Sequence, residues 1–217
     1  MRISELSTRS GVSTASIKFY AREGLLPAGE RTGYNQTDYS EAHLRRLRLI
    51  RSLIDVGGLP VAAAARVLAS IDAPDHPLEQ VLSTAQSALP QPVSPPSPAS
   101  VRRAEEFVAG RGWRAGPQNP GLRILAGVLD AWAAVGREDL ASVLPEYARA
   151  ADVIAEADLD AVSTAVEGAR TGGDRAAAAQ TVVVGTVLGD QLLVGLRRIA
   201  QENASARRYR PTEGNPS

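Results

Sequence analysis

The stretch GVSTASIKFYAREGLLPAGERTGYNQTDYSEAHLRRLRLI, residues 11–50, decides the fold of the amino-terminal third of the chain. Ser13 suits the start of a helix, because its hydroxyl can accept a hydrogen bond from a free backbone N–H. Gly24 suits the end of the same helix, because glycine readily adopts the left-handed conformation found there. With a shorter helix before Gly11, this pattern predicts a helix-turn-helix.

The next segment predicts a small β-hairpin. Residues 25–39 contain a proline and two glycines between apolar or aromatic ends, which favours a hairpin over a helix. Ser40 can then cap a helix to about Val56, and Pro60 can open another helix because proline is tolerated in the first turn. We therefore expect a mainly α protein that begins with a winged helix-turn-helix and ends in an all-α bundle.

The second predicted helix has two unlike faces. Ile17 and Tyr20 share the face that is expected to pack against the protein, whereas Lys18, Phe19 and Arg22 share another face. This arrangement leaves cationic side chains available to a polyanion.

Several spaced motifs resemble the amino terminus of the MerR-type bacterial transcription regulators. They read Ile3-Ser4-Glu5-Leu6, Gly11-Val12-Ser13, Ile17-Lys18-Phe19-Tyr20-Ala21 and Gly24-Leu25-Leu26. The resemblance covers about seventy residues. It implies a dimer with an amino-terminal winged helix-turn-helix and a carboxy-terminal effector domain.

The resemblance also implies a set of DNA-binding residues, with the second helix in the major groove. On and beside that helix they are Ser13, Thr14, Ser16, Lys18, Phe19, Tyr20 and Arg22. On the wing they are Arg31, Asn35, Gln36 and Tyr39, and on the following helix they are Arg45 and Arg48.

For some of these residues the sequence leaves two interpretations open. Tyr20 could reach a phosphate or pack in the core, and Phe19 could contact a thymine methyl group or pack under the wing. Tyr39 could anchor the hairpin, since the wing reads GYNQTDY where the family usually has Gly-Tyr-Arg-Xaa-Tyr. Arg45 and Arg48 could hold phosphates or lie on a solvated helix face.

Composition argues against several classes of protein. The chain has no cysteine, which excludes disulfides and thiolate metal sites, and its two histidines, His43 and His76, have no metal-ligand spacing. The sequence has neither a glycine-rich phosphate loop nor a nucleophile–base arrangement. We therefore expect no enzyme activity, no cofactor and no metal. Residues 1–73 hold ten basic and seven acidic residues, a weak cationic surplus in a chain of zero net charge.

Localisation is predicted to be cytoplasmic, with no membrane partner. The amino terminus lacks the apolar run of a signal peptide. The apolar stretch from Val182 to Leu196 is too short to span a bilayer and contains Asp190 and Gln191.

The remainder of the chain divides by composition. We predict a DNA-binding domain at 1–73, a short helix and proline-rich extended linker at 74–100, a helical effector and dimerisation domain at 101–206, and a polar tail at 207–217. Gly185, Gly189 and Gly195 could form a dimer or bundle seam, or lie in an ordinary buried helix. The aromatic residues of the effector domain could line an effector pocket or fill a core. They are Trp113, Trp132 and Tyr147.

The predicted function is a sequence-specific DNA-binding transcriptional regulator that binds an inverted-repeat promoter site as a homodimer. RNA polymerase and a small organic effector are its further possible partners. The alternative is a drug- or metabolite-binding protein that sequesters its ligand and uses its DNA-binding domain for autoregulation.

Overall fold

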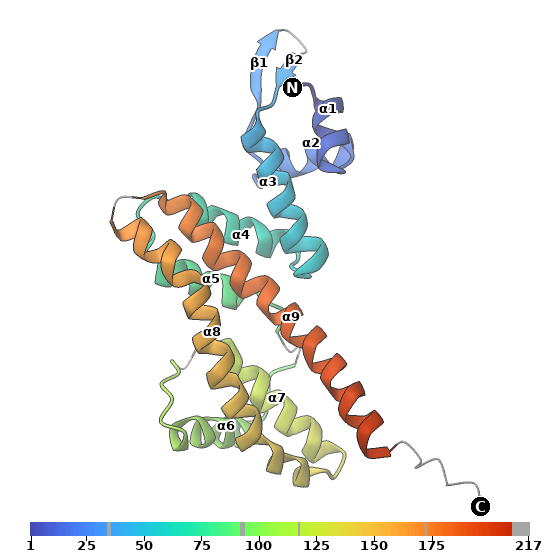
Figure 1. The fold of residues 1–217 in the computed structure, drawn as a ribbon, viewed down its shortest axis with the longest axis vertical. Coiled ribbons are helices and arrows are strands. Elements are labelled where there is room, and N and C mark those ends of the chain that lie inside the picture. Colours follow the sequence, from blue (N-terminus) through green and yellow to red (C-terminus); the bar gives the residue numbers. More distant parts are fainter. Residues whose placement is uncertain (34–35, 92–93, 117, 172, 210–217) are drawn as a thin grey trace, which may run out of the picture.

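The computed structural model describes residues 1–33, 36–91, 94–116, 118–171 and 173–209. The molecule is elongated, with the amino-terminal hairpin at one end and helices α6 and α7 at the other (Figure 1). Helix α9 runs along much of the long axis between these ends. The predicted fold class, a winged helix-turn-helix followed by an all-α region, is confirmed.

The helix-turn-helix consists of α1 (Ile3–Ser10) and α2 (Thr14–Arg22). Gly11 follows α1 with φ of +68°, a left-handed conformation that costs glycine little. The hydroxyl of Ser13 accepts a hydrogen bond from the Ser16 backbone N–H at 3.0 Å and so caps α2, as predicted.

The wing is an antiparallel hairpin of β1 (Glu30–Gly33) and β2 (Gln36–Asp38). Glu30 pairs with Asp38 and Arg31 pairs with Thr37, before an irregularity that precedes Gly33. The amino-terminal ammonium group of Met1 donates a hydrogen bond to the Tyr39 carbonyl oxygen at 2.6 Å. The chain terminus therefore holds the base of the wing against α1.

After the wing, α3 (Glu41–Arg51) continues into a π-helical turn (Ser52–Val56), and α4 (Val61–Asp72) follows. Ser40 precedes α3, where His43 Nδ1 accepts a hydrogen bond from the Ser40 backbone N–H at 3.0 Å. Leucine and isoleucine side chains from these helices fill the core with those of α1 and α2. Among its fully buried members are Leu6, Ile17, Leu25, Leu44, Leu47, Ile50, Leu53 and Leu68.

Two later helices extend this amino-terminal core. Helix α5 (Leu78–Ala88) packs against α4, and α9 (Arg175–Tyr209) packs against α5 and the π-helical turn. Ala179, Val183 and Val187 of α9 are buried in the same cluster as the side chains of α3 and α4. The domain boundary at residue 73 remains a prediction, but the hydrophobic core does not end there.

The far end of the molecule has a smaller core of its own. It consists of α6 (Pro98–Gly110), α7 (Pro120–Ala134), a 3-10 turn (Glu138–Val143) and the start of α8 (Leu144–Arg170). Ala104, Ala126 and Leu129 are its buried residues. The prediction of extended chain up to residue 100 was wrong for its last three residues, because Ser97 caps α6 and Pro98 occupies the first turn.

Two glycines of α9, Gly185 and Gly189, lie where this helix packs against α8. A Cβ on Gly185 would lie 3.4 Å from Val162 Cγ1 of α8, and one on Gly189 would lie 4.0 Å from Asp158 Oδ2. Small residues thus let α8 and α9 approach closely. Gly195 has no heavy atom within 4 Å of its hypothetical Cβ in the described part of the chain, so it does not belong to this seam.

Helix α9 is longer than the apolar stretch considered from sequence. It is long and apolar enough to cross a bilayer by length and composition, with a mean hydropathy of 1.4 over its most apolar window. Its buried Ala179, Val183 and Val187 nevertheless contact the protein core. This half of the helix has the packing of a bundle helix.

Candidate nucleic-acid interface

Helix α2 presents a polar face to solvent while it buries the opposite face. Thr14, Lys18 and Arg22 are exposed, whereas Ile17 is fully buried. The ammonium group of Lys18 makes no hydrogen bond or ion pair within the described residues. The helical periodicity predicted this division, because residues four apart share a face.

The serines at the start of α2 are occupied by the helix itself. Besides capping the helix, the Ser13 hydroxyl lies 2.8 Å from that of Ser16. Thr14 has no such side-chain partner in the described region and is exposed, so its hydroxyl is free to contact an external group.

The aromatic pair of α2 lies between the core and the exposed face. Tyr20 is half-buried against the amino-terminal core, and its ring centroid lies 5.8 Å from that of Phe19. The guanidinium of Arg22 lies 5.3 Å from the Phe19 ring centroid and also bonds Glu23. Tyr20 thus has a packing role, and its contact with a phosphate remains a prediction.

On the wing, Arg31 is exposed, and its guanidinium group has no hydrogen bond or ion pair among the described residues. Gln36 accepts a hydrogen bond from Arg2 at 2.9 Å, and Arg2 also pairs with Asp38. Asn35 lies outside the described residues. Arg2 was not among the predicted site residues, because its proximity to the wing depends on the fold.

Tyr39 packs at the base of the wing. Its side chain contacts the amino-terminal core, and its ring meets His43 edge-on at 5.3 Å between centroids. These contacts favour the anchoring role that the sequence left open. No finding tests a DNA contact by Tyr39.

The arginines of α3 fall into two groups. Arg46 bonds the Leu25 carbonyl oxygen at 2.8 Å and pairs with Asp72, and Arg51 pairs with Asp55. Arg45 and Arg48 are exposed, and their guanidinium groups make no hydrogen bond or ion pair within the described chain. Two of the four arginines are thus available to an anion.

Glu41, at the start of α3, is an acidic residue that interacts with this cationic surface. Its carboxylate accepts two hydrogen bonds from Arg9, and these bonds lower the pKa of Glu41. The charges of Arg45 and Arg48 lower the pKa of Glu41 further. Glu41 is therefore ionised and already bound to Arg9, which leaves the charges of Arg45 and Arg48 without a direct partner.

The predicted effector residues lie in the distal part of the molecule and have protein partners. Trp113 Nε1 donates a hydrogen bond to Asp152 at 2.8 Å, and Tyr147 accepts hydrogen bonds from Arg197 at 3.0 and 3.2 Å. Trp132 is half-buried against the distal core. Their joint role as a pocket remains a prediction.

A small hairpin beside two short helices, with a polar second helix and exposed cations around it, defines a winged helix-turn-helix protein. Residues 1–71 match the model of the MerR HTH family regulatory proteins. The chain also resembles the crystal structure of SCO5550 from Streptomyces coelicolor A3(2), a proposed transcriptional regulator. The TM-score is 0.62 and the identity 36%, over 96% of this chain and 98% of that one. Residues 1–71 of this chain therefore form a MerR-family helix-turn-helix domain.

Curated relatives match about a quarter of this chain. The mercuric resistance operon regulatory protein of Bacillus cereus is 38% identical over 56 residues, which are 26% of this chain and 42% of that protein. The HTH-type transcriptional regulator ZntR homolog of Haemophilus influenzae is 38% identical over 50 residues, 23% of this chain and 37% of that protein. The match spans about two fifths of the length of these relatives.

Proposed function

We propose that this chain is a cytoplasmic transcriptional regulator that binds an inverted-repeat promoter site as a homodimer. The observation that carries the proposal is a set of unpaired cations on α2, β1 and α3 of one small domain. They are Lys18, Arg31, Arg45 and Arg48. Because these side chains have no protein partner in the described region, they can bind phosphates without breaking an internal ion pair.

Sequence recognition is assigned to α2. Thr14 and Lys18 lie on its exposed face and can reach base edges when the helix enters the major groove. In a homodimer, two such helices would enter successive major grooves roughly 34–36 Å apart, or a multiple of that distance. An inverted repeat in the DNA matches the twofold symmetry of the protein.

The homodimer is supported by an exposed apolar surface on the second half of α9. Leu192, Leu196 and Ile199 are spaced four and three residues apart, and their side chains are 64%, 57% and 66% exposed. This is the spacing of a two-helix seam, and large exposed apolar residues of this kind are typical of interfaces. We call these three residues the α9 seam.

Regulation would act through the DNA-bound state. The resemblance to the family suggests that the dimer bends and untwists promoter DNA and so realigns it for RNA polymerase. A bend of this kind stores about 1–6 kcal/mol in the DNA. A small organic effector could change transcription only by binding the two DNA-bound states with different affinity.

The test is footprinting and gel-shift analysis with DNA from upstream of the protein's own gene. We expect a protected site with twofold symmetry. The double variant Lys18→Ala with Arg22→Ala should lose DNA binding and keep its thermal unfolding, because both residues are exposed.

The matched control is Arg102→Ala with Arg103→Ala, which removes the same charge from an exposed face of α6 in the distal part of the molecule. It should bind DNA as the wild type does. Normal gel shifts by the Lys18 and Arg22 double variant would refute the assignment of α2 as the recognition helix.

A further inference from the structure

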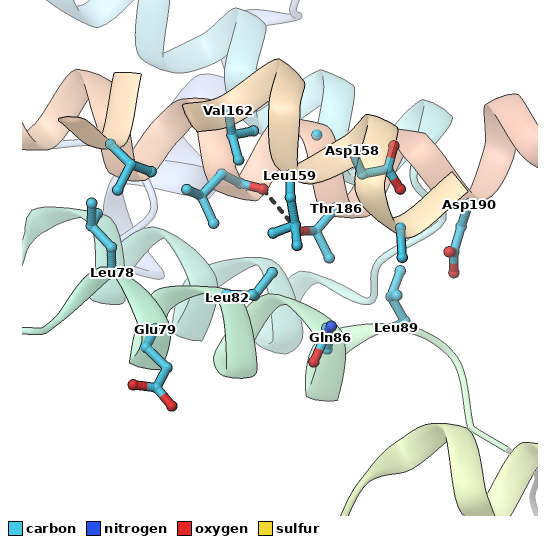
Figure 2. Close-up of a pocket in the computed structure, with 14 residues that line it drawn as sticks. Leu78, Glu79, Leu82, Gln86, Leu89, Asp158, Leu159, Val162, Thr186 and Asp190 are labelled. Carbon is cyan, nitrogen blue, oxygen red and sulfur yellow. Dashed lines mark hydrogen bonds between the residues drawn. The ribbon is translucent and has the colours of Figure 1, made fainter. Parts of the chain in front are cut away.

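A cavity of about 500 Å³ lies between α5, α8 and α9 (Figure 2). Its wall is mostly apolar, with leucines from α5 on one side and aliphatic residues of α8 and α9 on the other. The apolar lining consists of Leu78, Leu82, Leu89, Ala155, Leu159, Val162, Val166 and Val182. This volume lies within the usual range of small-molecule sites, which are also mostly apolar.

The apolar residues of the wall lack full cover from the protein itself. Leu78, Leu82 and Leu89 are only half-buried, and Leu159 is 53% exposed. An apolar ligand would remove this surface from water, which is favourable in proportion to the area covered.

Two exposed aspartates, whose charges interact, lie at one end of the cavity. Figure 2 shows Asp158 of α8 and Asp190 of α9 at the end near Leu89, whereas the Glu79 carboxylate points away from the cavity. Neither aspartate makes a hydrogen bond or ion pair among the described residues, and the lining contains no lysine or arginine. Burial raises the pKa of Asp190, and the charge of Asp158 raises it further.

Two uncharged polar side chains also line the cavity, those of Gln86 and Thr186. The Thr186 hydroxyl donates a hydrogen bond to the Val182 carbonyl oxygen at 2.8 Å within α9. The charged groups of the lining are all acidic, and a cation placed between Asp158 and Asp190 would relieve the repulsion of these two carboxylates.

We propose that this cavity binds an organic monocation with an apolar body. The cationic group would lie between Asp158 and Asp190, and the apolar body would lie along Leu82, Leu159 and Val162. This site differs in place from the aromatic residues considered from sequence, because Trp113, Trp132 and Tyr147 do not line the cavity.

Helix α9 links this cavity to the DNA-binding domain, and this step rests on the proposed function. Val182, Gly185 and Thr186 of α9 line the cavity, while Val183 and Val187, on another face of the same helix, are buried in the amino-terminal core. A ligand that shifts α9 relative to α5 and α8 would alter its packing against the π-helical turn. Binding of the cation is therefore expected to change the affinity for DNA.

The test of the cavity uses calorimetry on the full chain with three octyl compounds that differ in charge. Octyltrimethylammonium should bind saturably, octan-1-ol about tenfold more weakly, and octane-1-sulfonate not measurably. Asp158→Asn with Asp190→Asn should lower the affinity for the cation about tenfold and leave that for octan-1-ol unchanged. This variant should fold, because it removes two like charges.

Glu79→Gln is the matched control, since it removes one lining charge whose carboxylate points away from the cavity, and it should bind the cation as the wild type does. Equal binding of the ammonium and sulfonate compounds, or unchanged cation affinity in the double aspartate variant, would overturn the site.

Gel shifts with and without saturating octyltrimethylammonium test the coupling separately. A changed DNA affinity supports it. Saturable binding of the cation with unchanged DNA affinity overturns the coupling and favours the ligand-sequestering alternative. Failure of the ligand-free protein to bind DNA would refute the proposed function and leave the calorimetric result on the cavity standing.

Discussion

Neighbouring arginines on α3 are expected to contribute to different properties. Arg46 bonds the buried Leu25 and pairs with Asp72, so Arg46→Ala should lower the free energy of unfolding by about 1–3 kcal/mol. Arg45→Ala with Arg48→Ala should change stability by less than about 0.5 kcal/mol but weaken DNA binding. Each lost phosphate contact should also reduce the salt-dependence slope of binding by about 0.9.

Urea unfolding and gel shifts over a series of salt concentrations measure these two effects. If the double variant Arg45→Ala with Arg48→Ala shows the same salt dependence of DNA affinity as the wild type, neither side chain binds phosphate.

Asp130 is expected to make the stability of the distal bundle depend on pH. It accepts hydrogen bonds from the Ser97 hydroxyl at 2.7 Å and the Ser97 N–H at 2.5 Å, and hydrogen bonds from Ser97 and Ser100 lower the pKa of Asp130. A lowered carboxyl pKa adds stability that is present above the unfolded pKa of about 3.9 and is lost as pH falls through the folded value.

Thermal unfolding of wild type and Asp130→Asn between pH 7 and pH 3 checks this. The variant should be less stable at pH 7, and the difference should shrink below about pH 4. A difference that stays constant over this range would mean that the carboxylate charge is not involved.

The sequence could predict which residues of the site are exposed, but not which of their side chains lack a hydrogen-bond or ion-pair partner in the folded protein. The helical pattern placed Lys18 outside and Ile17 inside, as observed. It could not separate Arg45 from Arg46, because the acidic partner of Arg46 lies 26 residues further along the chain. The same limit applies to Arg2, whose contact with Gln36 spans 34 residues. Ion pairs of this kind depend on the folded chain.

At the scale of the element, the α9 seam gives a direct test of dimerisation. Leu196→Glu with Ile199→Glu should convert the protein to a monomer, because it places charges in a surface expected to be buried between subunits. The folding stability of the subunit should be nearly unchanged, since both side chains are exposed in the single chain. Sedimentation analysis measures the change.

Gln201→Glu adds a charge to an exposed position on another face of the same helix and should remain dimeric. A dimeric double variant would assign dimerisation to another surface, and a wild-type monomer would refute the seam itself.

Elements with local start and stop signals were predicted well. Ser13, Gly11 and Ser40 marked the ends of helices that the structure contains. The helix start at Pro98 was missed because five prolines in a short segment outweighed the cap at Ser97. The π-helical turn at Ser52–Val56 has no sequence signal of comparable strength, since its extra residue per turn depends on packing.

At the scale of the molecule, the long return of α9 connects parts that composition separates. Compositional boundaries divide the chain near residue 73, yet Ala179 and Val183 share a buried cluster with Leu53. No local pattern could predict this, because the partners are more than a hundred residues apart in sequence. Helix α9 therefore gives the carboxy-terminal region a direct mechanical contact with the DNA-binding domain.

Gly57 lies at that contact, and a double-mutant cycle can measure its contribution. A Cβ on Gly57 would overlap Val187 Cγ1 of α9 and lie 2.7 Å from the Leu53 carbonyl oxygen. Gly57→Ala should therefore lower the free energy of unfolding by about 1–3 kcal/mol, although the φ of −72° suits alanine. Val187→Ala removes one of the overlapping groups, so the double variant should lose about 0.5–3 kcal/mol less than the sum of the single variants.

Gly110→Ala is the control, because no heavy atom lies within 4 Å of its hypothetical Cβ in the described chain, and it should be neutral or slightly stabilising. Urea unfolding measures stability, and gel shifts on the same proteins report whether the contact affects DNA affinity. Gly57 and Val187 are not among the exposed cations of the candidate interface. If their substitutions change the DNA affinity and the effects are non-additive, the packing of α9 influences DNA binding. Additive effects on both quantities would show that the two parts of the molecule act independently.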